Sequence, residues 1–160
     1  MLSIQNILPE LQKDYPQVSF KAGEAFVWSP SNKQITYTTH QINAEHGAWA
    51  ILHELAHYEL EHTKYSTDFE LLKMEAAAWT RAKKIAKKYN VKIDNDHIQD
   101  CLDTYRDWLH TRAKCPNCHV ISTQRKDLHY QCFNCNSVWT VPKSPLCKIK
   151  KQIVNLIAEK

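Results

Sequence analysis

Hydrophobic residues recur at helical spacing over much of the chain. The predicted helices span residues 2–14, 44–62, 67–89, 95–113 and 146–157. The first of them is interrupted by Pro9. In the third, Thr67 and Glu70 have the spacing of a capping box, so this helix should begin near Thr67.

Three short segments before the second helix have the composition of β-strands. They cover residues 18–20, 25–28 and 34–39, and the last is rich in β-branched side chains. Residues 29–33, Ser-Pro-Ser-Asn-Lys, are typical of a turn between strands. The sequence therefore predicts an α+β fold, in which a mostly helical domain carries a small N-terminal antiparallel sheet.

Cysteines and aromatic residues replace the helical pattern in the last third of the chain. Residues 114–141 have no helical period, and prolines then break the chain before the last amphipathic segment. We therefore expect a first domain over residues 1–113, a zinc ribbon over 114–141, and a C-terminal amphipathic helix within 142–160.

The composition favours a folded protein of the cytoplasm. Hydrophobic residues make up 43% and charged residues 24% of the chain, which allows a packed core. No apolar run approaches the roughly 18 residues of a membrane span, so no membrane association is expected. The N-terminus lacks the basic start and unbroken apolar stretch of a signal peptide. In a reducing compartment, paired Cys-x-x-Cys spacing indicates metal binding rather than disulfides.

Charge is distributed unevenly along the chain. Residues 1–110 carry 12 Lys/Arg against 15 Asp/Glu, a net charge of −3, whereas residues 111–160 carry 9 against 2, a net charge of +7. Four zinc-bound thiolates would lower the second value by two, to +5. A basic C-terminal part indicates either an anionic partner, such as nucleic acid or an acidic protein surface, or a solvated helix face.

The predicted second helix contains the motif His53-Glu54-Leu-Ala-His57. Residues four apart share one face of a helix, so the two imidazoles can hold one ion. Zinc lowers the pKa of a water that it binds, and Glu54 can remove the proton without taking a coordination position. The alternative is a helix with two surface histidines.

A catalytic zinc ion usually has a third protein ligand. The downstream candidates are His62, Glu70, Glu75, His97 and His110. Glu75 falls within the apolar stripe of its predicted helix, where a lone buried carboxylate is costly unless something such as zinc compensates it. The alternative is an ion pair between Glu75 and a nearby Lys or Arg. His62 is a poor helical match for the face that carries His53 and His57, so it is either in contact with a ligand or simply exposed.

At these residues the sequence resembles the ImmA/IrrE-type metallopeptidases, a gluzincin-like family. The resemblance rests on the predicted strand and helix of residues 38–62 and on residues 74–79, Met-Glu-Ala-Ala-Ala-Trp, and it covers about residues 20–110. The chain departs from the family in having Ala56 where Gly is frequent, and in its cysteine-rich segment.

This resemblance implies a zincin-like fold, mostly helical with a small sheet. It also implies a zinc ion bound by His53, His57 and Glu75, and Glu54 as the general base. Members characterised as proteases cleave transcriptional repressors, which suggests the same class of substrate here.

Two Cys-x-x-Cys pairs predict a second metal site. Cys115 and Cys118 form the first pair, Cys132 and Cys135 form the second, and 13 residues separate the two pairs. Each pair can present two thiolates from one tight turn, and two pairs complete a tetrahedron around zinc. Because four thiolates leave no open position, this zinc would be structural.

Basic and aromatic side chains surround the four cysteines. The ribbon could therefore be a staple for the fold, a nucleic-acid module or a protein-docking module. Its aromatic residues could stack on bases or form its own small core. These side chains are Arg112, Lys114, Arg125, Lys126, Tyr130, Phe133 and Trp139.

The leading interpretation is a zinc-dependent endopeptidase with one catalytic and one structural zinc ion, acting on a cytoplasmic protein or peptide. The predicted strand over residues 34–39 could bind an extended substrate by strand addition. One alternative is a SprT/Spartan-like protease acting on DNA-associated proteins, although its third ligand is usually a histidine. The other is an inactive, metal-stabilised module that binds nucleic acid or protein, against which the intact Glu54 argues.

Overall fold

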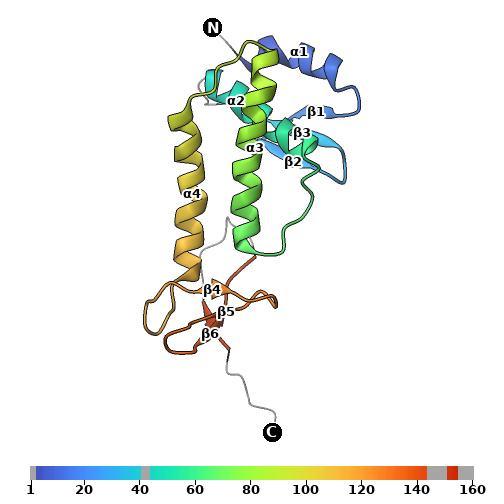
Figure 1. Ribbon diagram of the computed structural model, residues 1–160. Helices are drawn as coiled ribbons and strands as arrows, with labels where there is room; N and C mark the ends of the chain where they lie inside the picture. Colours follow the sequence, from blue (N-terminus) through green and yellow to red (C-terminus); the bar gives the residue numbers. More distant parts are fainter. Residues whose placement is uncertain (1–2, 41–43, 144–150, 155–160) are drawn as a thin grey trace. The chain divides into compact units, whose positions relative to one another are not determined.

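The computed structural model describes residues 3–40, 44–143 and 151–154. Its helices are α1 (Ile4–Asp14), α2 (Ala44–Glu59), α3 (Asp68–Lys88) and α4 (Asn95–Ala113). Its strands are β1 (Ser19–Ala22), β2 (Val27–Ser29), β3 (Gln34–Tyr37), β4 (Thr123–Gln124), β5 (Tyr130–Gln131), β6 (Val138–Thr140) and β7 (Gln152–Ile153). The fold is mixed α+β, as the sequence predicts (Figure 1).

The start of α3 confirms the predicted capping box. The Glu70 N–H donates to Thr67 Oγ1 at 3.2 Å, and the Thr67 N–H donates to Glu70 Oε2 at 3.3 Å. These bonds satisfy amides near the helix start that have no intrahelical partner. None of the helices described by the structure is both long and apolar enough to cross a membrane.

The chain divides into two compact units, and the division falls inside α3 and inside α4. The first unit comprises residues 1–64 and 73–99, and the second comprises residues 65–72 and 100–160. The domain boundaries expected from the sequence stay predictions. Each unit contains one of the two predicted metal sites.

The sheet of the first unit is mixed, and the prediction of an antiparallel sheet was wrong. β3 lies in the centre, where it pairs in parallel with β1 and antiparallel with β2. The chain therefore passes the end of β3 on its way from β1 to β2. A Cβ on Gly23 would lie 2.4 Å from Thr36 Cγ2, so a larger residue at this position would displace the Thr36 side chain. The composition of the strands does not reveal which of them lies in the centre.

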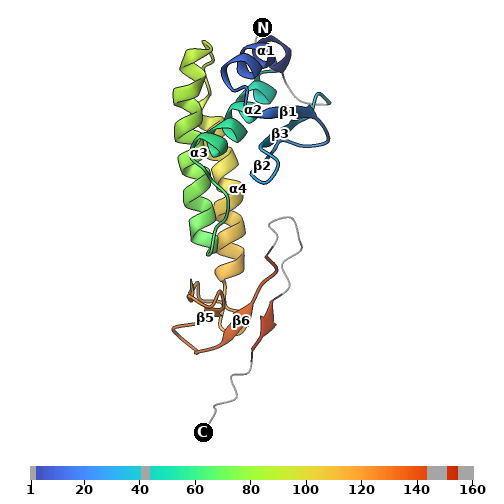
Figure 2. The same cartoon turned by 90° about the vertical axis from the view of Figure 1, so that its right-hand side faces the viewer.

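Helix α2 packs against β2, β3 and α1 in the first unit (Figures 1 and 2). Its apolar residues Ile51, Leu52 and Leu55 are completely buried, as is Ile35 of β3. His53 lies between these residues in sequence, and His57 follows Leu55 and the buried Ala56. Both histidines are consequently held among buried neighbours.

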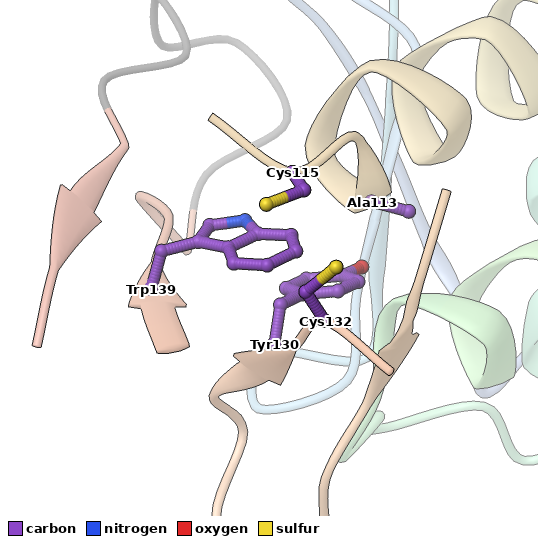
Figure 3. Close-up of a cluster of buried hydrophobic side chains, with 5 residues drawn as sticks. All are labelled: Ala113, Cys115, Tyr130, Cys132 and Trp139. Carbon is purple, nitrogen blue, oxygen red and sulfur yellow. The ribbon is translucent and has the colours of Figure 1, made fainter. Parts of the chain in front are cut away.

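The second unit contains an antiparallel sheet with the order β4-β5-β6-β7. Tyr130 of β5 and Trp139 of β6 stack with their ring centroids 5.5 Å apart and an angle of 13° between the planes. In Figure 3 these rings lie beside Cys115 and Cys132, and all four side chains are buried. Two rings and the cysteines thus form the core of this sheet.

A buried ion pair joins the first turn of α3 to the last turn of α4 within the second unit. The Nε–H of Arg112 donates to Asp68 Oδ2 at 2.8 Å, and the Tyr130 hydroxyl donates to the same oxygen. Gln124 Oε1 accepts the Asp68 backbone N–H at 2.8 Å. The cysteine-rich segment is therefore tied to both helices through this carboxylate.

The predicted C-terminal helix lies mostly outside the described residues, and within them the prediction was wrong. Residues 152–153 form β7, which pairs antiparallel with β6 at Trp139 and Thr140. The Val154 N–H also donates to the Val138 carbonyl at 2.8 Å. Pairing with an available strand edge outweighs the local helical pattern at these residues.

Candidate metal centres

His53, His57 and Glu75 form the donor group of the first unit. Their exposed fractions are 7%, 8% and 7%, and the histidines belong to α2 whereas Glu75 belongs to α3. The two histidines are four residues apart, so α2 presents both on one face. The structure brings together the three residues that the sequence singled out.

The distances between the donor atoms fit one metal ion. His53 Nε2 lies 3.0 Å from Glu75 Oε2 and 3.1 Å from His57 Nε2, and His57 Nε2 lies 3.4 Å from Glu75 Oε1. Zn–N and Zn–O bonds of about 2.0–2.1 Å at tetrahedral angles place two donors about 3.3 Å apart. Three buried donors at this spacing could hold a zinc ion and leave a fourth position open.

Glu75 is ionised in this environment. Burial by itself raises the pKa of Glu75, but hydrogen bonds with His53 and His57 outweigh it and lower the pKa to about 2. Its side-chain partners in the described part of the chain are these histidines, not the Lys or Arg of the alternative. Glu70, another candidate ligand, instead caps α3.

Glu54 lies outside this donor group and is held by the neighbouring strand. Its Oε2 accepts the backbone N–H of Trp28, in β2, at 2.7 Å. Trp28 lies in an edge strand of the sheet, and Val27 beside it is 50% exposed. The strand expected to accept a substrate, β3, is paired on both sides. The edge strands of this sheet are β1 and β2, and β2 is the one that contacts Glu54.

Two aromatic contacts surround the metal centre: that of Trp79 was not foreseen from the sequence, whereas contact of His62 with a ligand was one of its two alternatives. The ring of Trp79 stacks on His53 with centroids 4.2 Å apart. His62, one of the candidate ligands, lies on the other side of His57, with the two Nδ1 atoms 2.8 Å apart. Burial, and then the proximity of His57, lower the pKa of His62 below its usual value. Trp79 lies four residues after Glu75, so the two side chains share one face of the helix. This spacing is the sequence signal that could have predicted the contact between Trp79 and His53.

The remaining candidate ligands lie elsewhere. His97 stacks on His46 and also contacts Trp49, with centroids 4.6 and 4.9 Å away. His110 belongs to the second unit. Tyr58, which follows His57, accepts a hydrogen bond from Gln17 Nε2 through its hydroxyl at 2.7 Å.

Cys115, Cys118, Cys132 and Cys135 form the donor group of the second unit. The Cys115 and Cys135 sulfurs are 3.6 Å apart, and those of Cys118 and Cys132 are 3.4 Å apart. Zn–S bonds of about 2.3 Å at tetrahedral angles place two sulfurs about 3.8 Å apart. The four side chains could therefore hold one metal ion.

The two Cys-x-x-Cys turns have the same backbone conformation. The N–H groups of His119 and Asn136 donate to the carbonyls of Cys115 and Cys132, each at 3.0 Å. His119 and Asn136 both have positive φ, 65° and 59°. This repeated geometry turns both sulfurs of each pair toward the same point.

Backbone N–H groups stabilise the charged form of one sulfur. The Cys135 N–H lies 3.4 Å from Cys132 Sγ. This contact, opposed by burial, lowers the pKa of Cys132 to about 6. The contacts of Ser137 lower the pKa of Cys135 in the same direction. Burial and hydrogen bonds with Cys132 and Cys135 instead raise the pKa of Cys118. Thiolates are thus favoured at Cys132 and Cys135, and a thiolate is suited to a cation.

Several side chains expected to contact nucleic acid have structural roles. Tyr130 and Trp139 stack inside the sheet, and Arg112 is buried in its ion pair with Asp68. Phe133, by contrast, is 74% exposed. A nucleic-acid partner for this unit stays a prediction.

Scans of the chain against models of known protein families, curated proteins and solved structures gave no match. The functional conclusions therefore rest on the residues and their geometry.

Proposed function

We propose that this protein is a zinc-dependent endopeptidase. The proposal is carried by the buried group of His53, His57 and Glu75, whose donor atoms are spaced for one zinc ion. When bound, zinc lowers the pKa of a water molecule and polarises a carbonyl group. Two imidazoles and a carboxylate with a free fourth position are the donor set found in several zinc peptidases.

Glu54 would act as the general base. It follows His53 directly, and the Trp28 N–H holds one of its oxygens. Oε1 has no partner among the described residues, so it is free to accept a proton from the attacking water and to deliver it to the leaving amine. The same hydrogen bond fixes the side chain, which reduces the reorganisation needed for proton transfer.

The substrate would be an extended segment of another protein. β2 is an edge strand beside Glu54, so a peptide lying along this edge would pass the general base. The Trp28 N–H is bound to Glu54 and would not pair with that peptide. A cytoplasmic protein, such as a transcriptional repressor, is the substrate class that the sequence resemblance suggests. The presence of a carboxylate as third donor favours this reading over a SprT/Spartan-like protease.

Glu54→Gln provides a matched test. Glutamine keeps an oxygen that accepts the Trp28 N–H, but it cannot take a proton. Zinc-loaded wild-type protein and Glu54→Gln would be incubated with a cell lysate from the source organism, and new protein N-termini would be identified by mass spectrometry. The variant should keep its zinc content and its unfolding midpoint while cleavage falls by about 10²–10⁴.

Two outcomes would contradict the proposal. Equal cleavage by wild type and Glu54→Gln would remove Glu54 from the chemistry. The absence of new N-termini with wild-type protein that holds zinc at the first site would favour the non-catalytic alternative, a metal-stabilised binding module.

A further inference from the structure

The two ring nitrogens of His57 face different partners. Nε2 lies 3.1 Å from His53 Nε2 and 3.4 Å from Glu75 Oε1, inside the donor group. Nδ1 lies 2.8 Å from His62 Nδ1, on the opposite side of the ring. The first nitrogen is placed to bind a metal, and the second is placed to form a hydrogen bond.

Metal binding decides which nitrogen carries each proton. A ligating imidazole is neutral and must offer the lone pair of Nε2, so the proton of His57 lies on Nδ1. That N–H points to His62 Nδ1, which can accept it only with its own lone pair. His62 must then carry its proton on Nε2.

We propose that His62 is a positioning residue for the metal ligand His57. Its Nδ1 accepts the His57 Nδ1–H, which fixes both the tautomer and the ring orientation of the ligand. Partners of this kind orient metal-bound histidines and raise their basicity. The inference rests on the metal centre of the proposed function and not on peptide hydrolysis.

The backbone holds His62 in place for this role. The His62 N–H donates to the His57 carbonyl at 3.0 Å, and the His62 carbonyl accepts the indole N–H of Trp28 at 3.2 Å. Glu61, with φ of 54°, turns the chain at the end of α2 so that His62 folds back. The residue is therefore fixed from both the helix and β2.

The other metal ligand shows what is specific to His57. His53 Nδ1 is buried and has no hydrogen-bond partner among the described residues. Its ring is oriented instead by stacking on Trp79. Among the described residues, His62 thus supplies the hydrogen-bond acceptor for the one ligand ring nitrogen that faces away from the donor group and has a partner.

Two substitutions separate hydrogen bonding from packing. In His62→Asn the side-chain oxygen can take the place of Nδ1 and accept the same N–H. In His62→Phe the ring remains but the acceptor is lost. The zinc affinity of the first site would be measured by competition with a chromophoric chelator. Glu75→Ala should lose zinc from the first site only, so comparison with this variant shows which part of the titration belongs to that site.

We expect His62→Phe to weaken zinc binding by about 10–100-fold and His62→Asn to remain within about threefold of wild type. His40→Phe, the same change at an exposed histidine, should leave the affinity unchanged. Equal affinity of His62→Phe and wild type would overturn the proposal. An equal loss in His62→Asn and His62→Phe would also overturn it, because packing would then explain the effect.

A measurement on wild-type protein does not depend on the folding of any variant. Nitrogen-15 NMR of the zinc-loaded protein should place the His57 proton on Nδ1 and the His62 proton on Nε2. The opposite tautomer of His62 would overturn the proposal. If the first site of wild-type protein binds no zinc at all, the metal centre and the proposed function fall together, which distinguishes that result from failure of the His62 role alone.

Discussion

The buried ion pair between Asp68 and Arg112 should dominate the stability of the second unit. The two residues are only 4% and 2% exposed. Arg112 donates to both carboxylate oxygens, from Nε at 2.8 Å and from Nη2 at 3.3 Å. Removal of one partner leaves the other as a buried, uncompensated charge, which typically costs about 3–5 kcal/mol.

A double-mutant cycle measures this coupling. Asp68→Leu and Arg112→Met should each lower the free energy of unfolding by about 3–5 kcal/mol. The double variant removes both charges, and its main cost is the lost acceptor of the Tyr130 hydroxyl, about 1–3 kcal/mol. It should therefore be more stable than either single variant.

Urea unfolding followed by tryptophan fluorescence provides the assay. Free zinc must be held at the same excess throughout, because bound metal adds to the apparent stability. Arg106→Met is the control on the same helix: Arg106 pairs with Asp103 at 2.6 Å, but the side chains are 45% and 61% exposed. An exposed pair contributes at most about 1 kcal/mol. The coupling between Asp68 and Arg112 would be refuted if the buried variants lost no more stability than this control. It would also be refuted if the loss in the double variant equalled the sum of the two single losses.

Three further results are expected. Elemental analysis of purified protein should give about two zinc ions per chain. Glu75→Ala and Cys132→Ser should each reduce the zinc content to about one. An unchanged zinc content would show that the substituted residue is not a zinc ligand. Gly23→Ala should destabilise the first unit by about 1–3 kcal/mol in thermal unfolding, because its Cβ would clash with Thr36 Cγ2. Thr36→Ser removes Cγ2 and should restore part of this stability in the double variant. If the stability losses of the two single variants simply add in the double variant, the two side chains do not clash. Burial and neighbouring carboxylates raise the pKa of Tyr15, Tyr89 and Tyr130 above the usual 10, so their contribution to stability is complete below pH 10 and is lost as the pH rises further. Absorbance titration should accordingly show fewer phenolates at pH 11 in folded than in urea-unfolded protein, and equal numbers would disprove it.

The sequence by itself determined the features that depend on nearby residues. It predicted the helical segments now seen as α2, α3 and α4, together with the capping box at Thr67. The spacing of His53 and His57 places both on one helix face whatever surrounds that helix. Likewise, each Cys-x-x-Cys turn is closed by bonds within its own few residues, so its shape follows from local sequence.

Only the tertiary structure decided which distant groups meet. From the sequence, Arg112 was one of the basic side chains expected to contact a partner. In the fold it is buried and paired with Asp68, 44 residues away. β1 pairs in parallel with β3, 15 positions further along the chain, and Gly23 lies against Thr36 at the end of this pairing. The sequence left His62 either in contact with a ligand or exposed, and the turn after α2 places it beside His57. The physical reason is common to all three: burial and hydrogen bonding between distant segments outweigh local preferences, and no local pattern records which segments come together.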